Sequence, residues 1–256
     1  MAYIYETHLH TCEASACGRS HGRDYIPYMK EKGYSGIIVT DHFFNGNSAV
    51  PRDLPWKRRC DLYCAGYEQA LEASLDPATA NGLKVFFGIE YNFQGDEYLL
   101  YGVDKNWLYD NPDILSCSRS EVYKRVHQGG GIMVHAHPYR ERDYLDTIHL
   151  TPSVCDGAET FNAGNDPYMN ALGKEYALQH HFLEAGGSDV HHANNGPLGG
   201  MLFAHPLDTI QDYVQSFLAG EGTPVIRLDN GQFVPVSEVP EQCVISRRET
   251  LPVVWH

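Results

Sequence analysis

Histidine is the residue type whose number and spacing in this sequence suggest chemistry. The 256-residue chain contains fourteen histidines, and eight of them form close pairs. Imidazole nitrogens and carboxylate oxygens are the ligands that Zn²⁺, Fe²⁺ and Mn²⁺ bind in proteins. A chain of this composition contains roughly one HxH pattern by chance, so the positions of the pairs matter more than their presence. The pairs are His8/His10, His135/His137, His180/His181 and His191/His192.

The candidate ligands follow segments that are typical of buried strands. The apolar run Gly36–Thr40 leads directly into Asp41 and His42, and Leu83–Ile89 leads into Glu90. Continuous apolar runs of this kind are typical of strands that are covered on both faces. The same relationship predicts strands at Ala2–Thr7, Gly131–Val134 and His181–Gly187, which precede His8/His10, His137 and Asp189/His191.

Helical segments alternate with these strands, with helices expected at Arg23–Lys32, Ser118–Gln128 and Asp166–Gln179. Repeated βα units imply a mainly parallel sheet, either open or closed into a barrel. In a βα barrel the carboxyl ends of the strands gather around one mouth, and catalytic groups come from several of them. We therefore expect ligands that are far apart in the sequence to converge on a single site.

A set of histidines and carboxylates of this size suits two or three divalent ions, with Zn, Fe or Mn as candidates. Two such ions about 3.5–4 Å apart can hold a bridging hydroxide and stabilise the leaving oxygen of an in-line displacement at phosphorus. No protein nucleophile is then required.

Five motifs occur at these strand ends in a fixed order, namely HLHT at 8–11, TDH at 40–42, GIE at 88–90, HAHP at 135–138 and GSDVH at 187–191. This ordered series resembles the motifs of the PHP superfamily, named for polymerase and histidinol phosphatase. The resemblance spans about residues 5–205. It implies an α/β fold, a distorted (β/α)7 barrel of PHP type, with up to three metal ions at its mouth.

The resemblance also implies roles for individual residues. Glu90 matches the carboxylate that bridges two metals, and Asp41 is expected to orient its neighbour rather than to bind metal. The residues that match metal ligands are His8, His10, His42, Glu90, His137, Asp189 and His191.

The sequence departs from the family pattern in two segments that concern the third metal. After HLHT it reads CEASACG, and after GIE it reads DEYLLYG, where many members carry an Asp or His and a His, respectively. His135 could supplement this third site. The other candidates in the two segments are Glu13, Ser15, Cys17, Asp96, Glu97 and Tyr98.

Phosphate binding requires cationic groups near the metals. Arg19 and Arg140 lie next to ligand motifs, and a guanidinium offers a bidentate fork for phosphate oxygens. We therefore place both arginines among the candidate catalytic residues, together with Asp41.

The formal net charge of −14 counts against extended contact with nucleic acid, but bound cations would still permit a small anionic substrate. No apolar run approaches the roughly 20 residues needed to cross a bilayer. The first residues lack the basic and apolar regions of a secretory signal, and the seven cysteines include no CxxC pair. We therefore expect a cytoplasmic protein with reduced thiols and no membrane partner; its oligomeric state is not indicated.

We expect residues 1–222 to form the barrel and residues 223–256 to form a C-terminal β-hairpin extension, because Asp229-Asn230-Gly231 is a turn signal. The expected activity is hydrolysis of a phosphate ester by a metal-bound hydroxide, with a small phosphorylated metabolite or nucleotide as substrate. Two alternatives stay open, a nuclease that acts on DNA or RNA ends and a non-catalytic metal-binding module that regulates a partner.

Overall fold

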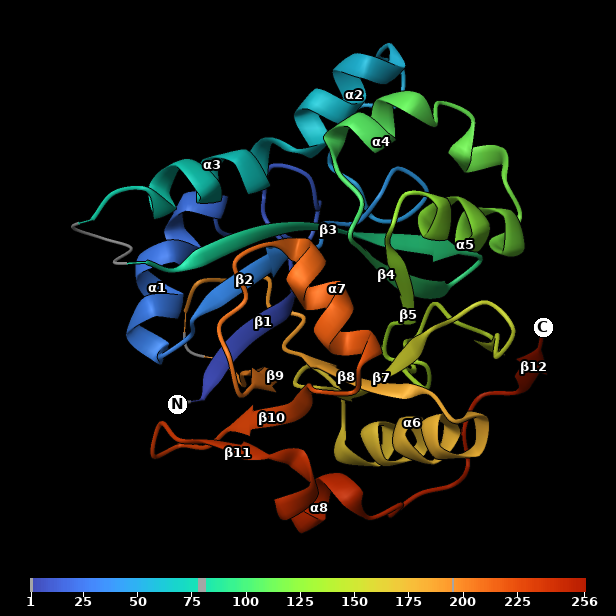
Figure 1. Cartoon of the computed structure of the whole chain (residues 1–256). Helices are drawn as coiled ribbons and strands as arrows, with labels where there is room; N and C mark the ends of the chain where they lie inside the picture. The colour runs from blue at the N-terminus through green and yellow to red at the C-terminus, as the bar shows by residue number, and fades with distance from the viewer. Residues whose placement is uncertain (1, 78–81, 195) are drawn as a thin grey trace.

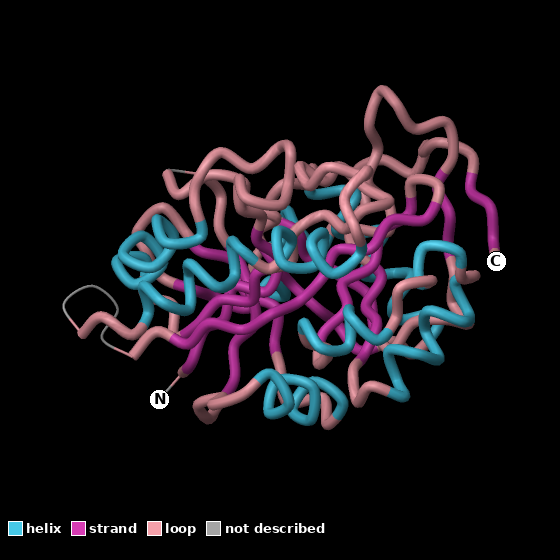
Figure 2. The backbone as a smooth tube through the Cα atoms, turned by 90° about the horizontal axis from the view of Figure 1, so that it is seen from above, coloured by secondary structure: helices cyan, strands magenta, loops and turns pink. Residues whose placement is uncertain are grey.

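The computed structural model describes residues 2–77, 82–194 and 196–256. The chain forms an α/β fold in which a sheet of ten strands curls into an incomplete barrel, with helices around its outside (Figures 1 and 2). None of the helices in these ranges is both long and apolar enough to cross a membrane. The strands are β1 (Tyr3–Leu9), β2 (Gly36–Val39), β3 (Lys84–Phe93), β4 (Asp96–Tyr101), β5 (Ile132–His135), β6 (Ile148–Leu150), β7 (Gly157–Asn162), β8 (Leu183–Gly187), β9 (Gly199–Phe203), β10 (Thr223–Arg227), β11 (Phe233–Pro235) and β12 (Val253–Trp255). The α-helices are α1 (Tyr25–Lys32), α2 (Trp56–Tyr63), α3 (Ala65–Ser74), α4 (Lys105–Asp110), α5 (Arg119–Gln128), α6 (Pro167–His180), α7 (Ile210–Leu218) and α8 (Pro240–Cys243).

The main sheet is mixed, in the order β11-β10-β9-β1-β2-β3-β4-β5-β7-β8. The curled α/β sheet agrees with the expected barrel, but a seven-stranded and mainly parallel arrangement is too simple. β4 runs antiparallel to both β3 and β5, and β9 runs antiparallel to β1 and β10. Only Gln94 and Gly95 connect β3 to β4, both with positive φ. Such a two-residue turn can join only antiparallel strands, because parallel strands need a crossover of a dozen or more residues.

The barrel is drawn together between β1 and the segment that follows β8. Leu9 and Val190 form an isolated parallel bridge, and the backbone nitrogen of His10 donates to the Val190 oxygen at 2.9 Å. Deeper in the barrel, the Thr7 hydroxyl donates to the Gly186 oxygen at 2.7 Å. These bonds place the two ends of the predicted ligand series side by side.

Alternating side chains of β2 supply two different cores. Ile37 and Val39 pack with Tyr25 and other apolar side chains of α1, outside the sheet. Ile38 points the other way and packs with Tyr5 and other side chains inside the barrel. Because successive side chains of a strand face opposite sides, the continuous run GIIV is buried on both faces, as the sequence predicts.

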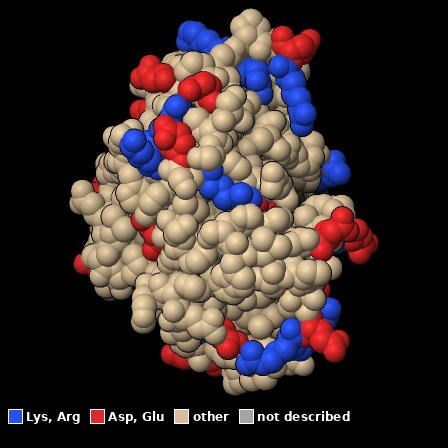
Figure 3. Space-filling model, turned by 90° about the vertical axis from the view of Figure 1, so that its right-hand side faces the viewer, with Lys and Arg blue, Asp and Glu red and all other residues tan. Residues whose placement is uncertain are grey.

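Charged side chains are interspersed on the face shown in Figure 3. Lysines and arginines lie close to aspartates and glutamates there, around a broad area of uncharged residues. Among the described residues drawn on this face, no wide basic patch is seen, and such a patch is the usual footprint of a protein that grips a nucleic-acid backbone.

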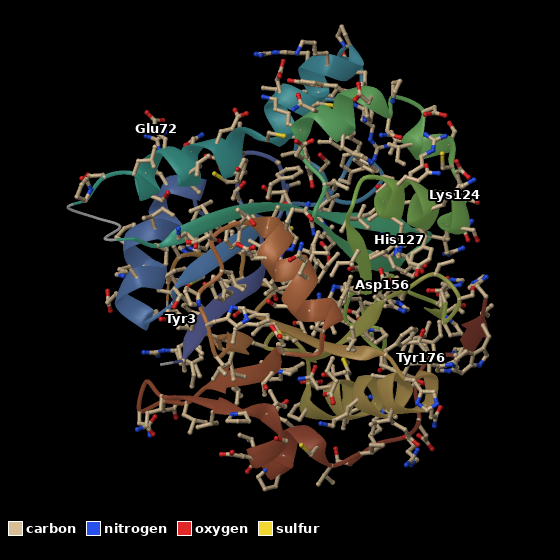
Figure 4. All side chains as sticks on the ribbon, in the orientation of Figure 1. Tyr3, Glu72, Lys124, His127, Asp156 and Tyr176 are labelled. Atoms are coloured by element: carbon tan, nitrogen blue, oxygen red, sulfur yellow. The ribbon has the colours of Figure 1, made fainter. Side chains whose placement is uncertain are left out.

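Residues 223–256 contribute to two sheets. β10 pairs antiparallel with both β9 and β11, so this part of the segment extends the main sheet. β12 then pairs in parallel with β6, and the Trp255 ring lies 6.1 Å from that of Tyr176. Tyr176, on α6, is labelled in Figure 4. The proposed boundary between residues 222 and 223 stays a prediction.

Candidate metal centre

Glu90 is the point at which the predicted ligands meet. It lies in β3 and is 1% exposed. Its Oε2 lies 2.6 Å from His42 Nδ1, and its Oε1 lies 3.0 Å from His8 Nε2 and 3.1 Å from His137 Nε2. Three histidines from three different strand ends therefore surround one buried carboxylate.

Asp189 is the second buried carboxylate of the cluster. Its Oδ1 lies 3.0 Å from His10 Nε2 and 3.5 Å from His8 Nε2. His10 Nε2 also lies 3.4 Å from Glu90 Oε2, so His8 and His10 both stand between the two carboxylates. The His191 ring stacks on that of His10 at 4.4 Å and completes the group on this side.

The ligand atoms form overlapping sets, each with its atoms within 4.8 Å of one another. Because the sets share members, their centres are adjacent, as in a site for more than one ion. All seven residues predicted as ligands occur in them. The sets are His8/Glu90/His137, His8/His10/Asp189, His10/His42/His191 and His42/Glu90/Glu97.

The donor atoms of the cluster are better placed to bind a divalent cation than to hydrogen-bond with one another. His8 Nε2, His10 Nε2, His42 Nδ1 and Glu90 Oε2 are buried, and none has a well-directed hydrogen bond to any described residue despite the short distances. Buried polar atoms without partners are rare in proteins and need an explanation such as a bound ion. Imidazole nitrogens mixed with carboxylate oxygens suit zinc, iron or manganese.

The electrostatics of the cluster agree with this donor set. Although burial alone raises the pKa of a carboxyl group, His42, His8 and His10 hold the pKa of Glu90 well below its ordinary value. Arg140 and His8 similarly outweigh burial at Asp189 and hold its pKa well below normal. Burial and the neighbouring His42 lower the pKa of His10 to about 3, which keeps this imidazole neutral and able to bind a cation.

His8 is oriented by a residue that the sequence analysis missed. Its Nδ1 lies 3.0 Å from Oε1 of Glu159, a fully buried carboxylate in the middle of β7. The other Glu159 oxygen accepts the backbone N–H of His137 at 3.0 Å. The available signal was a glutamate inside the otherwise strand-like segment GAETFN, since a buried carboxylate needs partners.

Asp41 belongs to none of these ligand sets and instead holds the loop that follows β1. It accepts hydrogen bonds from the Thr11 backbone at 2.6 Å, the Thr11 hydroxyl at 2.7 Å and the Ser15 hydroxyl at 2.6 Å. Ser15 Oγ also lies 3.1 Å from His10 Nδ1 and accepts the backbone N–H of His42 at 2.9 Å. Asp41 therefore acts on the cluster through Ser15, which links it to two of the histidines.

The backbone is strained where it presents ligands. His137 and Asp189 have φ values of 29° and 55°, in the left-handed region that non-glycine residues seldom adopt. Close to Asp189, Gly187 leaves room for the cluster, because a Cβ there would lie 2.6 Å from the His8 Cβ and 2.9 Å from Glu159 Oε1. Such strain persists only where the surrounding contacts hold it, and it is concentrated at functional sites.

The two predicted phosphate-binding arginines have different surroundings. Arg140 forms an ion pair with Asp189 and also donates to Asn162 at 2.7 Å and Asn165 at 2.8 Å, so its guanidinium is used within the protein. Arg19 is exposed, and its backbone nitrogen donates to the His191 oxygen at 2.8 Å. Arg140 therefore lies at the cluster, whereas Arg19 lies on the loop beside it.

Two of the candidates for the third metal site, Glu97 and Cys17, lie at the cluster. Glu97 belongs to the cluster, with Oε1 3.5 Å from His42 Nδ1 and Oε2 3.7 Å from His137 Nε2. Cys17 lies beside His42; burial alone would raise the pKa of its thiol, but His191 and His42 lower it to about 6.

Two of the other candidates, Glu13 and His135, lie apart from these ligand sets. Glu13 instead forms a separate group with Cys12 and His21. His135 stacks on Tyr98 at 5.1 Å and is absent from the ligand sets of the described residues.

A cavity of about 560 Å³ opens onto the cluster. Its wall includes the ligands His42, His137, Asp189 and His191. The rest of the lining comes mainly from three segments, residues 45–47 after β2, residues 92–97 around the β3–β4 turn, and residues 135–149.

No protein-family model matches the sequence, and no curated protein matches it. Solved structures do match the fold. A two-domain protein from Bacteroides vulgatus, described as containing a predicted PHP-like metal-dependent phosphoesterase, aligns with a TM-score of 0.61 and 14% identity over 88% of this chain. The chain spans 64% of that protein.

Two further structures share the fold. A putative metal-dependent phosphoesterase from Bifidobacterium adolescentis has a TM-score of 0.55 and 17% identity, over 85% of this chain and 96% of its own length. A lesion-specific endonuclease from Pyrococcus furiosus has a TM-score of 0.53 and 13% identity, over 89% of this chain and 58% of its own. These matches agree with the resemblance predicted from the motifs: in its fold, the chain is similar to structures described as PHP-like or putative metal-dependent phosphoesterases. Its own buried histidine–carboxylate sets are of the kind that can hold metal ions.

Proposed function

We propose that this protein is a hydrolase of small phosphate esters that works with two or three divalent metal ions. The observation that carries the proposal is the position of Glu90, whose two oxygens face His8, His42 and His137 at 2.6–3.1 Å. The two oxygens face histidines of different ligand sets. A carboxylate placed in this way can bridge two cations, offset their mutual repulsion and set their separation.

The residues that would hold the ions are the seven predicted ligands, with Glu97 as an eighth. Divalent ions held by these residues would lower the pKa of a bound water and stabilise charge on the oxygens around phosphorus. The chain itself orients the ligands: Glu159 holds His8, Ser15 holds His10, and Arg140 holds Asp189. Glu97 lies in the segment DEYLLYG, in which many PHP members carry a histidine.

The cavity supports a small substrate. Its volume of about 560 Å³ lies within the roughly 300–1,000 Å³ of typical small-molecule sites. The net charge of −14 and the interspersed charges in Figure 3 offer little for a long polyanion to bind. A phosphorylated metabolite or mononucleotide fits these conditions.

A nuclease is the second candidate, because the Pyrococcus furiosus endonuclease has a similar fold. A third possibility is a metal-binding module without catalysis. The salt dependence of turnover separates the two enzymes, since a protein that grips several phosphates loses affinity steeply as salt rises, whereas a small ester is affected modestly.

The test is a metal analysis of the purified protein, followed by an activity screen of the metal-loaded form. We expect at least two transition-metal ions per chain and hydrolysis of phosphomonoesters or mononucleotides that a chelator abolishes. Turnover of oligonucleotides alone, with a steep salt dependence, would favour the nuclease. Full metal content without turnover of any phosphate ester would favour the non-catalytic module.

A further inference from the structure

Arg140 and Arg142 lie two residues apart on the loop that follows β5, and both line the cavity. They differ in what their guanidinium groups contact. Arg140 forms an ion pair with Asp189 and donates to two asparagine side chains. Its charge is balanced by a ligand carboxylate, and three of its nitrogens already have protein acceptors.

Arg142 has no such balance. Its Nη1 donates to the neighbouring Glu141 carbonyl oxygen at 3.0 Å, and among the residues that the structure describes no carboxylate forms an ion pair with it. Burial and the nearby Arg140 charge lower its pKa from the ordinary value. A partly buried cation without a counter-charge is costly in the free protein and is readily satisfied by a bound anion.

The backbone around Arg142 is held at the cavity. The nitrogen of Arg140 donates to the oxygen of the ligand His137 at 2.9 Å, and the nitrogen of Leu145 donates to the Arg142 oxygen at 2.9 Å. The Leu145 side chain lies against the β3–β4 turn, where a Cβ at Gly95 would come within 2.9 Å of Leu145 Cδ2. The backbone at Arg142 is thus held between the ligand His137 and the β3–β4 turn across the cavity.

We propose that Arg142 is the residue that binds the phosphate group of the substrate, and that Arg140 positions Asp189. The inference rests on the proposed function and names a substrate class for it, the phosphate monoester dianion. A monoester has three unesterified oxygens, so one face can meet the metal centre while other oxygens accept the guanidinium fork of Arg142. A diester has only two such oxygens and one negative charge.

The test compares four variants of the metal-loaded protein: Arg142→Gln, Arg142→Lys, Arg140→Gln and Arg58→Gln. Arg58 is exposed on α2 and serves as the control. The probes are inorganic phosphate, titrated calorimetrically, and p-nitrophenyl phosphate, followed by steady-state kinetics. Metal content and circular dichroism are recorded for each variant.

Arg142→Gln should weaken phosphate binding and raise KM by about tenfold each, with metal content unchanged, because one charge-assisted contact is lost. Arg142→Lys should recover part of the loss, since it keeps the charge but not the fork. Arg140→Gln should instead lower metal content, and Arg58→Gln should behave as the wild type.

Two results would overturn the inference. If the wild type turns over phosphomonoesters while Arg142→Gln keeps wild-type phosphate affinity and KM, the inference fails and the proposed function stands. If Arg142→Gln loses metal or fold, Arg142 is structural and the assignment is wrong. A metal-loaded wild type that neither binds phosphate nor hydrolyses any phosphate ester overturns the proposed function, and the inference with it.

Discussion

His8 Nδ1 lies 3.0 Å from Glu159 Oε1, inside the barrel where both side chains are completely buried. Because an ionised carboxylate can only accept, Nδ1 must carry a hydrogen, and in the neutral ring the lone pair is then on Nε2. That nitrogen faces Glu90 and Asp189 at 3.0 and 3.5 Å. Glu159 therefore selects the tautomer that can bind a metal.

Glu159→Gln should lower metal affinity or activity by about 10–100-fold without unfolding the protein, since partners of this kind have effects of that size. Metal titration measures the affinity, and circular dichroism shows whether the variant is folded. Glu72→Gln, at an exposed position of α3, is the matched control. Unchanged metal affinity in Glu159→Gln would show that the ring needs no such partner.

Ser15→Ala should lower activity by roughly tenfold or more. The hydroxyl donates to Asp41 and accepts from His42 N, and its oxygen lies beside His10 Nδ1, so its loss frees the His10 ring and leaves the buried Asp41 with fewer donors. Kinetics at saturating metal, compared with the exposed Ser120→Ala, measure the effect. Equal activity of the two variants would exclude an orienting role.

Glu90→Gln should remove at least one metal per chain and reduce the rate on the order of a thousandfold or more, because the neutral amide cannot bridge two dications. Asp189→Asn should weaken one site for the same reason. Elemental analysis and steady-state kinetics are the measurements, with circular dichroism as the check on folding. Full metal content and near-native rates in Glu90→Gln would contradict the proposed centre.

Glu6 provides a pH-dependent prediction about stability. Its Oε1 accepts the backbone N–H groups of His8 and Ser188 at 2.9 Å each, yet burial raises its pKa from about 4.5 to about 7. The folded state then holds a proton that the unfolded chain releases, so wild-type stability falls as the pH rises from about 4.5 to about 7. The loss from this group is about 3 kcal/mol, at 1.36 kcal/mol for each pKa unit.

Glu6→Gln should remove this loss. The amide oxygen can accept both backbone N–H groups, and the amide nitrogen can donate to Ser188 Oγ, whose hydrogen can turn to the Gly199 oxygen at 3.4 Å. Urea unfolding of metal-free wild type and variant at pH 5 and pH 8 tests this. The variant should gain stability relative to the wild type at the higher pH, and an equal difference at both pH values would refute the assignment.

The sequence by itself predicted that the strands would carry the candidate ligands at or near their carboxyl ends, although β1 and β3 extend past the predicted ends to include His8 and Glu90. GIIV before Asp41 and His42, and the segment before Glu90, are apolar runs that can be stable only when both faces are covered. Their carboxyl ends must then lie at one edge of the sheet. The local pattern therefore predicts that candidate ligands from several strands share one location, whereas the assignment of all seven as ligands came from the family resemblance.

Only the tertiary structure decided which groups support those ligands. Glu159, Ser15 and Arg140 act on His8, His10 and Asp189 through contacts that depend on how separate elements pack. The difference between Arg140 and Arg142 is of the same kind, because both are arginines of one loop and only one meets a carboxylate. The type and spacing of residues indicate which chemistry a side chain can perform. Its partners depend on distances between elements that are far apart in the sequence, and the local pattern does not contain those distances.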